Sequence, residues 1–433
     1  MKVSSLKAMI DIAASVLHRV VEKRTSLDRA FQEVVHGVGS RLYEKVPHRA
    51  LYRMCRHVVS NYLKLRYLDR EVLGHRRPSF RRLVREWIAL ELDRLDELLG
   101  IEGASEGFKR IVDPSTDLRN LFEEALQRVE DPIERASIEL SYPRWLVEEL
   151  SRVMGLDEAI QLLKRMNEVE DLWIRVNTLR SDVDRVVREL EEQGVVVERD
   201  GDLWYMLRVV DYERPLHRLP QLSRCEIVMQ DKASAMVVEA LEPEPGDQIL
   251  DLAAAPGVKA SLVMQLTDNR ARLVLIDVSR ERVSRMKRFL KCMGVDTDRI
   301  DIALADSTRL SLSRSLDKAL VDAPCTGSGT VSRDPAVKVF LEDEATVPEL
   351  QRIQRGMLAT ALRHAGTTVF ATCSVLPREG EEIVSDVSDR LVDPGIAAGS
   401  PGYSAYPFSG LVRRFFPHRH ATHGFFIAKL VRR

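Results

Sequence analysis

Apolar residues recur at steps of three and four positions along the first part of the chain. Leu17 and Val20 show this spacing, and Leu51 and Met54 repeat it further on. Such a period gathers apolar side chains on one face of an α-helix, and no strand-like alternation interrupts it. The pattern predicts an all-helical domain over residues 1–130.

The pattern changes between residues 140 and 235. DVDRVVRELEEQG is typical of an amphipathic helix that ends at Gly194, whereas LWIRVNTL, VVVER and WYMLRVV are typical of short strands. Asp200-Gly201 between the last two strands favours a two-residue hairpin turn. We therefore expect a small α/β domain over residues 140–235.

Five short apolar runs alternate with helix-length segments from residue 236 onward, namely QILDLA, ARLVLID, RIDIALA, KALVDA and TTVFAT. Strands separated by helices predict a parallel sheet with helices on both faces. The last run, GFFIAKLVR, has no helix after it, which indicates an antiparallel edge at the C-terminus. The fold class is α/β, and residues 236–433 form the third expected domain.

The 433 residues are 45% hydrophobic and 30% charged, the balance of a globular protein with two or three domains. No apolar run approaches the roughly 18 residues that a membrane span needs. The N-terminal segment carries Asp11 within its apolar part and has no cleavage site of a signal peptide. We expect a cytoplasmic monomer with no membrane partner.

Positive charge is concentrated at the start of the chain. Residues 1–90 contain 19 Lys and Arg against 8 Asp and Glu, so this block carries +11, the remainder −12 and the whole chain −1. Basic runs such as HRALYRMCRH and HRRPSFRRLVR could each be a solvated helix face. A whole block of one sign favours nucleic acid as the partner.

The cysteines are spread along the chain, as Cys55, Cys225, Cys292, Cys325 and Cys373. No two are close enough for C-x-x-C ligation, and an odd number in a large chain argues against a disulfide framework, so free thiols are predicted. Cys55 and Cys292 fit the small buried hydrophobe that a helical cysteine usually is, and Cys225 has no context that indicates more. The three histidines of FFPHRHATHG have no acidic or thiol neighbour in sequence, which argues against a metal site.

Ligands of a parallel sheet bind beyond the carboxyl ends of its strands. The first strand runs into DLAAAPGVKA, where small residues and Gly257 let the backbone approach a ligand closely. The second strand ends in Asp277, 20 residues after that glycine, the spacing at which an acid binds ribose hydroxyls. The third and fourth end in Asp306 and Asp322; each acid could instead cap the next segment, Asp306 above all. Because G-x-G-x-x-G and the P-loop are missing, S-adenosylmethionine is favoured over NAD or ATP.

Several motifs together resemble those of one family. DLAAAPGVKA, VDAPCTGSGT, ATCSVLPREGEE and THGFFIAKL resemble the signature motifs of the Sun-type (Fmu/RsmB) RNA cytosine-5 methyltransferases, and IRVNTL and VMQDKAS resemble its shorter flanking motifs. The N-terminal block resembles, more weakly, a NusB-like RNA-binding domain. This pairing is similar to the bacterial-type enzymes that act on 16S ribosomal RNA. The resemblance implies a Rossmann-like, S-adenosylmethionine-dependent methyltransferase domain after a NusB-like domain and a small α/β domain.

The resemblance and the strand ends together define the expected cofactor site. Its residues are Ala253, Ala254, Ala255, Pro256, Gly257, Val258, Lys259, Asp277, Arg282, Asp306 and Asp322. The family's first motif is usually D-x-C-A-A-P-G-G-K-T, and here Ala253, Val258 and Ala260 replace the cysteine, the second glycine and the threonine. His423 stands where aspartate is common. Arg282 could instead be a surface arginine of its helix.

Methylation at C5 of cytosine has work for two thiols. C5 is too weakly nucleophilic to take a methyl group unaided, and a thiolate that adds to C6 turns the ring into a reactive enamine. The adduct must then lose the C5 proton and expel the thiolate, a step that a second thiol can assist. DNA cytosine-5 methyltransferases use the Pro-Cys thiol, here Cys325, and sequence spacing does not decide between the two. The resemblance to the RNA family implies that Cys373 attacks and that Cys325 assists release.

Two further residues are candidates for this chemistry. Asp322 could hold a proton against N3 of cytosine, which requires the raised pKa that apolar surroundings produce. Lys259 could contact the base or position Asp322. The alternatives without a catalytic role are a buried thiol at a strand end for Cys373 and a turn cap for Asp322.

The sequence therefore predicts an RNA cytosine-C5 methyltransferase acting on structured RNA. Ribosomal RNA, and 16S in particular, is favoured by the NusB-like block, and transfer RNA is the alternative substrate. A non-catalytic RNA-binding factor for ribosome assembly is the alternative from a different class.

Overall fold

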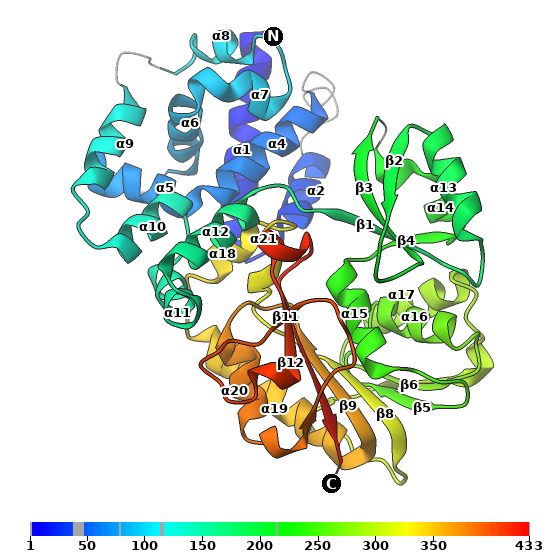
Figure 1. Cartoon of the computed structure of the whole chain (residues 1–433). Coiled ribbons are helices and arrows are strands. Elements are labelled where there is room, and N and C mark those ends of the chain that lie inside the picture. The colour runs from blue at the N-terminus through cyan, green and yellow to red at the C-terminus, as the bar shows by residue number, and fades with distance from the viewer. Residues whose placement is uncertain (1, 38–46, 78, 113–116, 214, 433) are drawn as a thin grey trace. The chain divides into compact units, whose positions relative to one another are not determined.

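The computed structural model of the chain describes residues 2–37, 47–77, 79–112, 117–213 and 215–432. These residues form two compact units (Figure 1). The first contains Met1–Glu168 and Thr330–Glu344, and the second contains Val169–Gly329 and Ala345–Arg433. No helix within the described ranges is long and apolar enough to cross a membrane.

The first unit is helical throughout its described residues, as the apolar period predicts. Leu17, Val20, Leu51 and Met54, which carry that period, all lie in its core. The helices are α1 Val3–Lys23, α2 Leu27–Gly37, α4 His48–Ser60, α5 Tyr62–Tyr67, α6 Phe80–Leu90, α7 Leu95–Leu99, α8 Ala104–Phe108, α9 Leu118–Gln127, α10 Pro132–Leu140, α11 Arg144–Met154 and α12 Leu156–Asn167, with a π-helical turn at Leu68–Val72.

A segment from much later in the chain, Thr330–Glu344, completes this helical unit. Its helix α18 (Ala336–Phe340) places Val339 in the core of the helical unit. The buried Lys338 donates from Nζ to three carbonyl oxygens of that unit, and burial lowers the pKa of Lys338 well below its ordinary value. The N-terminal residues therefore depend on this late segment for a closed core.

A small antiparallel sheet opens the second unit, in the order β2-β3-β1-β4 (Figure 1). The elements are β1 Leu172–Val176, α13 Val183–Glu192, β2 Val195–Arg199, β3 Met206–Tyr212, α14 Pro220–Ser223 and β4 Ile227–Met229. The helix and strands follow the sequence pattern, but the two-residue turn at Asp200-Gly201 is wrong. Residues 200–205 connect the two strands, because Oδ1 of Asp200 accepts hydrogen bonds from the backbone nitrogens of Asp202 and Leu203 and so builds a longer turn.

The large sheet of the second unit has the order β11-β12-β13-β9-β8-β5-β6-β7, with β10 beside β13 (Figure 1). Its strands are β5 Gln248–Asp251, β6 Arg272–Asp277, β7 Ile300–Leu304, β8 Leu316–Asp322, β9 Ala365–Thr372, β10 Leu391–Val392, β11 Ser400–Pro401, β12 Val412–Phe415 and β13 Phe425–Val431. The strands from β9 to β7 are parallel, as predicted. β13 is antiparallel, as predicted, and β12 pairs with its other side, so the antiparallel edge is wider than one strand.

Helices cover both faces of the large sheet, which gives the Rossmann-like arrangement. They are α15 Lys232–Leu241, α16 Val258–Leu266, α17 Arg280–Cys292, α19 Thr346–His364 and α20 Glu381–Ser385, and the short α21 Pro417–His420 follows β12. Alternate strand residues enter two separate apolar clusters, for example Ile249 on one face and Leu250 on the other. The chain leaves β5 toward β6 and later returns to its other side as β8, so the strand order reverses at β5. Such a reversal opens a ligand crevice at the carboxyl ends of the strands.

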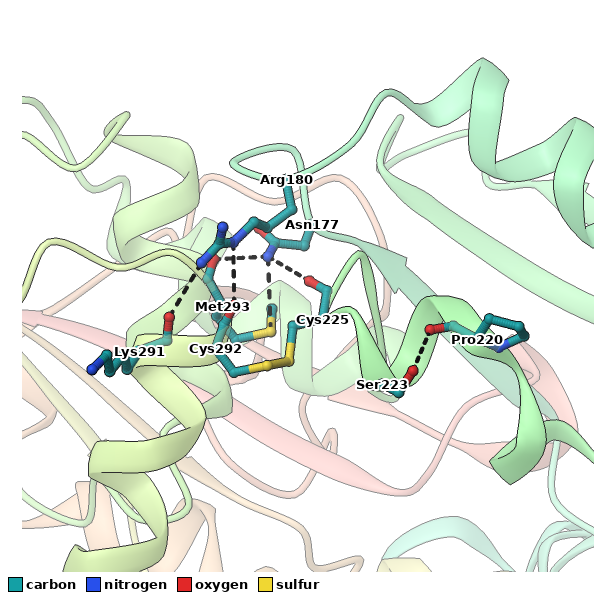
Figure 2. The surroundings of a disulfide bond; sticks show 8 residues. All are labelled: Asn177, Arg180, Pro220, Ser223, Cys225, Lys291, Cys292 and Met293. Atoms are coloured by element: carbon teal, nitrogen blue, oxygen red, sulfur yellow. Dashed lines mark hydrogen bonds between the residues drawn. A yellow bond between two sulfur atoms is a disulfide. The ribbon is translucent and has the colours of Figure 1, made fainter.

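Cys225 and Cys292 form a disulfide bond, so the prediction that both are free thiols is wrong. The two residues lie 67 positions apart, one just after α14 and the other at the end of α17. Figure 2 shows Asn177 beside this bond, where its Nδ2 donates to the carbonyl oxygens of Cys225 and Met293. Sequence spacing gives no sign of the pair, because only the packing of the small sheet against α17 brings the two cysteines together.

Candidate active site

Acidic residues end three neighbouring parallel strands at one edge of the large sheet. Asp251 is the last residue of β5, Asp277 of β6 and Asp322 of β8. Because β5 lies between the other two strands, the carboxylates lie on both sides of the crevice at the strand reversal. The remaining predicted acid, Asp306, lies two residues beyond β7 and is exposed. Its carboxylate accepts hydrogen bonds from the backbone nitrogen and Oγ1 of Thr308, which is the capping arrangement and lowers the pKa of Asp306.

The turn after β5 brings the backbone across the end of β6. The backbone nitrogen of Ala254 donates to the carbonyl oxygen of Ile276, and Gly257 begins helix α16 with a φ of 99°. A side chain at Gly257 would also meet Met286 of α17, with 3.0 Å between its Cβ and the Cγ of that methionine. Glycine is therefore required here for both conformation and space.

Asp277 is only 3% exposed and faces this turn. Its carboxylate accepts hydrogen bonds from the backbone nitrogens of Ala255 (3.3 Å) and Ser279 (2.9 Å). Arg282 lies with Nη1 3.5 Å from Oδ2 of Asp277 and also donates to the carbonyl oxygen of Ala255. The structure thus brings the predicted residues Asp277, Arg282 and Ala255 together.

S-adenosylmethionine needs acceptors for its ribose hydroxyl groups and a backbone that comes close without bulky side chains. Asp277 supplies a carboxylate, and Ala253–Ala255 carry side chains no larger than a methyl group. The residues present fit this cofactor. Asp251, to which sequence reasoning gave no role, is buried beside them, and burial raises the pKa of Asp251 to about 7.

The two cysteines of the sequence motifs meet at the ends of β8 and β9. Cys325 follows β8 by three residues and Cys373 follows β9 directly, and these strands are parallel neighbours. Their Sγ atoms lie 3.2 Å apart, within hydrogen-bonding distance. The hydrogen bond to Cys373 raises the pKa of Cys325 well above its ordinary value, and burial adds to this. Either sulfur can donate in this contact, and the raised pKa favours Cys325 as the protonated partner.

Close backbone packing holds the two cysteine loops together. The backbone nitrogen of Gly329 donates to the carbonyl oxygen of Cys373, and that of Gly424 donates to the carbonyl oxygen of Gly329. A Cβ atom on Gly329 would collide with the backbone of Gly424. This contact explains physically why GSGT and THGFF both carry glycine.

Lys259 and Asp322 form an ion pair beside the cysteines. Nζ of Lys259 lies 2.5 Å from Oδ2 of Asp322, and both side chains are largely buried. The same ammonium group lies 5.8 Å from the ring centroid of Phe425. The sequence predicts that Lys259 contacts either the target base or Asp322. The contact with Asp322 is present in this structure.

Three side chains that sequence reasoning missed hold the cysteine loops. Glu379 is fully buried and accepts hydrogen bonds from Thr326, the residue after Cys325. Glu381 forms a fully buried ion pair with Arg414, and Arg414 also donates to the carbonyl oxygen of Ser374, the residue after Cys373. The acids of PREGEE were the only signal, and their partners come from distant parts of the chain.

The histidines near the C-terminus include one with acidic partners that sequence reasoning missed. Nε2 of His423 lies 2.7 Å from Oε2 of Glu170, and its Nδ1 lies 3.9 Å from Asp231. Within the described ranges, one group has its ligand atoms close enough for a metal ion, in the helical unit: Asp69, His75 and Glu86. There the guanidinium of Arg82 already pairs with Asp69, which is the place that a cation would take.

The comparisons with known proteins agree with this geometry. A family model described as 16S rRNA methyltransferase RsmB/F matches residues 238–431, and one described as an RsmF/B-like ferredoxin-like domain matches residues 142–210. The 25S rRNA (cytosine-C(5))-methyltransferase nop2 of Schizosaccharomyces pombe is 27% identical over 74% of this chain and 56% of its own, so the chain spans about half the length of that relative. Ribosomal RNA small subunit methyltransferase B of Klebsiella pneumoniae is 25% identical over 98% of this chain and 97% of its own.

A solved structure adds the same similarity. NSun6 from Pyrococcus horikoshii, determined with SFG, superimposes with a TM-score of 0.60 at 26% identity and covers 67% of this chain and 98% of its own. Both matched family models, the curated relatives and this structure agree on one group of proteins. Over residues 142–210 and 238–431 the chain is similar to the Sun-type (RsmB/F) RNA cytosine-5 methyltransferases.

Proposed function

We propose that this chain methylates C5 of a cytosine in 16S ribosomal RNA through a covalent adduct with Cys373. The observation that carries the proposal is the 3.2 Å contact between the Sγ atoms of Cys325 and Cys373 at the ends of two neighbouring parallel strands. Covalent methylation at C5 needs one thiol that attacks and a second group that assists release. The ion pair of Lys259 and Asp322 lies at the same strand ends.

The cofactor is S-adenosylmethionine, which supplies an electrophilic methyl group when bound. Asp277 and the turn at Ala253–Ala255 bind its nucleoside part in this proposal, and Arg282 orients Asp277. When the target base binds, a proton taken up from solvent is held between Asp322 and N3 of the base, and Lys259 positions the Asp322 side chain.

Sγ of Cys373 adds to C6 of the cytosine, and the electron pair of the C5–C6 double bond becomes available at C5. After methyl transfer a water molecule takes the C5 proton, the electron pair of that C–H bond re-forms the C5–C6 double bond, and the Sγ–C6 bond breaks with its electron pair returning to sulfur. Cys325 donates a hydrogen bond to that departing sulfur, which is the role its retained proton allows. The target base has to leave its stack to reach these thiols.

The choice of 16S over other RNA rests on coverage. The small-subunit enzyme of Klebsiella pneumoniae aligns over 97% of its own length, whereas the 25S enzyme of Schizosaccharomyces pombe aligns over 56%. Transfer RNA remains the alternative substrate, and a cytoplasmic location belongs to the same proposal. The exposed arginines of the basic block, among them Arg76, Arg77 and Arg85, are the proposed RNA-binding surface.

Methylation of unmodified RNA tests this function directly. Purified chain is incubated with methyl-labelled S-adenosylmethionine and either 30S-derived ribosomal RNA or bulk transfer RNA, and the product is mapped. Label at C5 of a cytosine in 16S RNA is the expected result. Label in transfer RNA alone would replace the substrate and keep the chemistry, and cofactor binding without transfer to any RNA would favour the assembly factor.

A further inference from the structure

Glu379 is fully buried, and its carboxylate contacts Thr326, the residue that follows Cys325. Its Oε1 accepts hydrogen bonds from the backbone nitrogen of Thr326 at 2.9 Å and from Nε2 of Gln354 at 3.0 Å. Its Oε2 accepts a third from Oγ1 of Thr326 at 2.5 Å. Both oxygens therefore bind Thr326, the residue that directly follows Cys325. Gln354 of α19 fixes the orientation of the carboxylate through its hydrogen bond.

A cation compensates the negative charge of the neighbouring Glu381, whereas no cation pairs with Glu379 among the described residues. Glu381 pairs with the guanidinium of Arg414 at 2.5 Å, and neither side chain is exposed. Within the described part of the chain, the carboxylate of Glu379 accepts hydrogen bonds from a side-chain amide, a hydroxyl group and a backbone nitrogen, and all three donors are neutral. Burying a carboxylate without a cation costs free energy, even when hydrogen bonds compensate part of it.

The unneutralised charge acts on the thiol pair. Hydrogen bonding to Cys373 and burial raise the pKa of Cys325 most, and the negative charge of Glu379 acts in the same direction. Removing a proton from Cys325 would place a second negative charge beside Glu379. This charge favours Cys325 as the donor and Cys373 as the acceptor of their 3.2 Å contact.

We propose that Glu379 is a positioning residue of the methyl transfer, which fixes the Cys325 loop through Thr326 and keeps Cys325 a hydrogen-bond donor to the attacking sulfur. The proposal rests on the proposed function for the identity of that attacking sulfur. Loss of the Glu379 charge leaves both thiols in place and reduces the asymmetry between them.

Alkylation of the two thiols as a function of pH tests this without RNA or cofactor. The full chain is treated with iodoacetamide between pH 6 and pH 10 and digested with trypsin, which places Cys325 and Cys373 in separate peptides, 319–333 and 364–378. In Glu379→Gln, which keeps the shape of the side chain, Cys325 should be alkylated about tenfold faster at each pH below its midpoint, which corresponds to a fall of that midpoint by about one pH unit. Glu382→Gln is the matched control, because Glu382 lies in the same motif and has no contact with Thr326; its profile should equal that of the unchanged protein.

An unchanged Cys325 profile in Glu379→Gln would overturn the proposal. If that variant does not fold, judged by its thermal melt, Glu379→Asp decides the question. It keeps the charge, so its Cys325 midpoint should stay near that of the unchanged protein, and a fall of one unit would overturn the proposal too. Because the readout is thiol reactivity, a protein that methylates no RNA could still show the predicted shift, and the two failures are distinguishable.

Discussion

Two pairs of cysteines meet in the second unit, and the fold treats them in opposite ways. Cys225 and Cys292 are joined by a disulfide bond, whereas Cys325 and Cys373 lie 3.2 Å apart with their sulfur atoms unbonded. The first pair connects the small sheet to the end of a helix. The second lies at the carboxyl ends of parallel strands, where ligands of such sheets bind.

The surroundings explain the difference. Around the bonded pair, Asn177 and Arg180 donate to backbone carbonyl oxygens on both sides, so polar contacts support the same connection as the covalent bond (Figure 2). Around the unbonded pair, Glu379 holds one loop and Arg414 the other, each through contacts with the residue after the cysteine. These contacts leave the two thiols unbonded, and covalent catalysis requires this because the attacking sulfur has to be free to bond to C6.

The largest effect should come from the unbonded pair. Cys373→Ala removes the attacking sulfur, so methyl transfer should fall to background and no RNA adduct should form. Cys325→Ala leaves attack and transfer intact and slows elimination, so protein should accumulate covalently bound to RNA. A denaturing gel of each variant with RNA and S-adenosylmethionine should show a slow band for Cys325→Ala only.

The double variant is the control for this experiment. It should show no slow band, because release matters only after attack. If the slow band appeared in Cys373→Ala instead, Cys325 would be the nucleophile. If both single variants kept full activity, the covalent route would be excluded and the two pairs would no longer differ in function.

The bonded pair should affect stability and leave the chemistry unchanged. Cys225→Ser with Cys292→Ser opens a loop of 67 residues, which in the chain-entropy model removes about 4 kcal/mol of unfolding free energy. Denaturant titration of this variant, with and without reductant, measures the loss. The unchanged protein should lose stability in reductant and the variant should not. Full stability of the variant would mean that the bond contributes nothing beyond the contacts of Asn177.

Sequence could predict one pair and not the other, for a physical reason. Cys325 and Cys373 each end a short motif at a strand end, and parallel strands bring such ends together whatever lies between them. Cys225 and Cys292 have no local motif, and their contact depends on how the small sheet packs against α17. Glu379 could not be found from the sequence for the same reason. Its proposed role depends on burial and on contact with Thr326, which lies 53 positions earlier in the chain.

The strands and helices of the second unit follow from periodicity, which is local. The turn at Asp200-Gly201 does not, because its side-chain hydrogen bonds to Asp202 and Leu203 override the preference of the dipeptide for a two-residue loop. The acids predicted for the cofactor site differ in the same way, because only some of them lie where the strand-end pattern places them. Asp277 lies buried in the crevice, whereas Asp306 was chosen on spacing and forms an exposed cap.

Cofactor affinity provides a sharper test of whether the bonded pair is only structural. Helix α17 carries Arg282, beside Asp277, near its start and Cys292 at its end. Asp277→Ala should lower S-adenosylmethionine affinity by about 1.5–3 kcal/mol, because hydrogen bonds to a charged carboxylate are lost. Calorimetric titration should give a much smaller loss for Asp306→Ala and none on reduction of Cys292. A loss on reduction equal to that of Asp277→Ala would connect the disulfide to the cofactor site.

RNA capture should depend on neither pair, and this prediction carries the smallest expected effect. Exposed arginines of the basic block should displace counterions from RNA, so Ala in place of Arg76, Arg77 and Arg85 should reduce the salt slope of binding by about one unit per lost contact. Deleting the block is a poor test, because Thr330–Glu344 would lose the helices that cover it.

The matched control removes equal charge from the same unit outside the block, with Ala in place of Lys109, Arg110 and Arg128, which are also exposed. Filter binding over a salt series should give this control nearly the slope of the unchanged protein. Equal loss from both triple variants would mean that net charge alone attracts RNA. Lost affinity on reduction of Cys225–Cys292 would show instead that the bonded pair holds part of the RNA surface in place, and the division between a structural and a chemical pair would then fail.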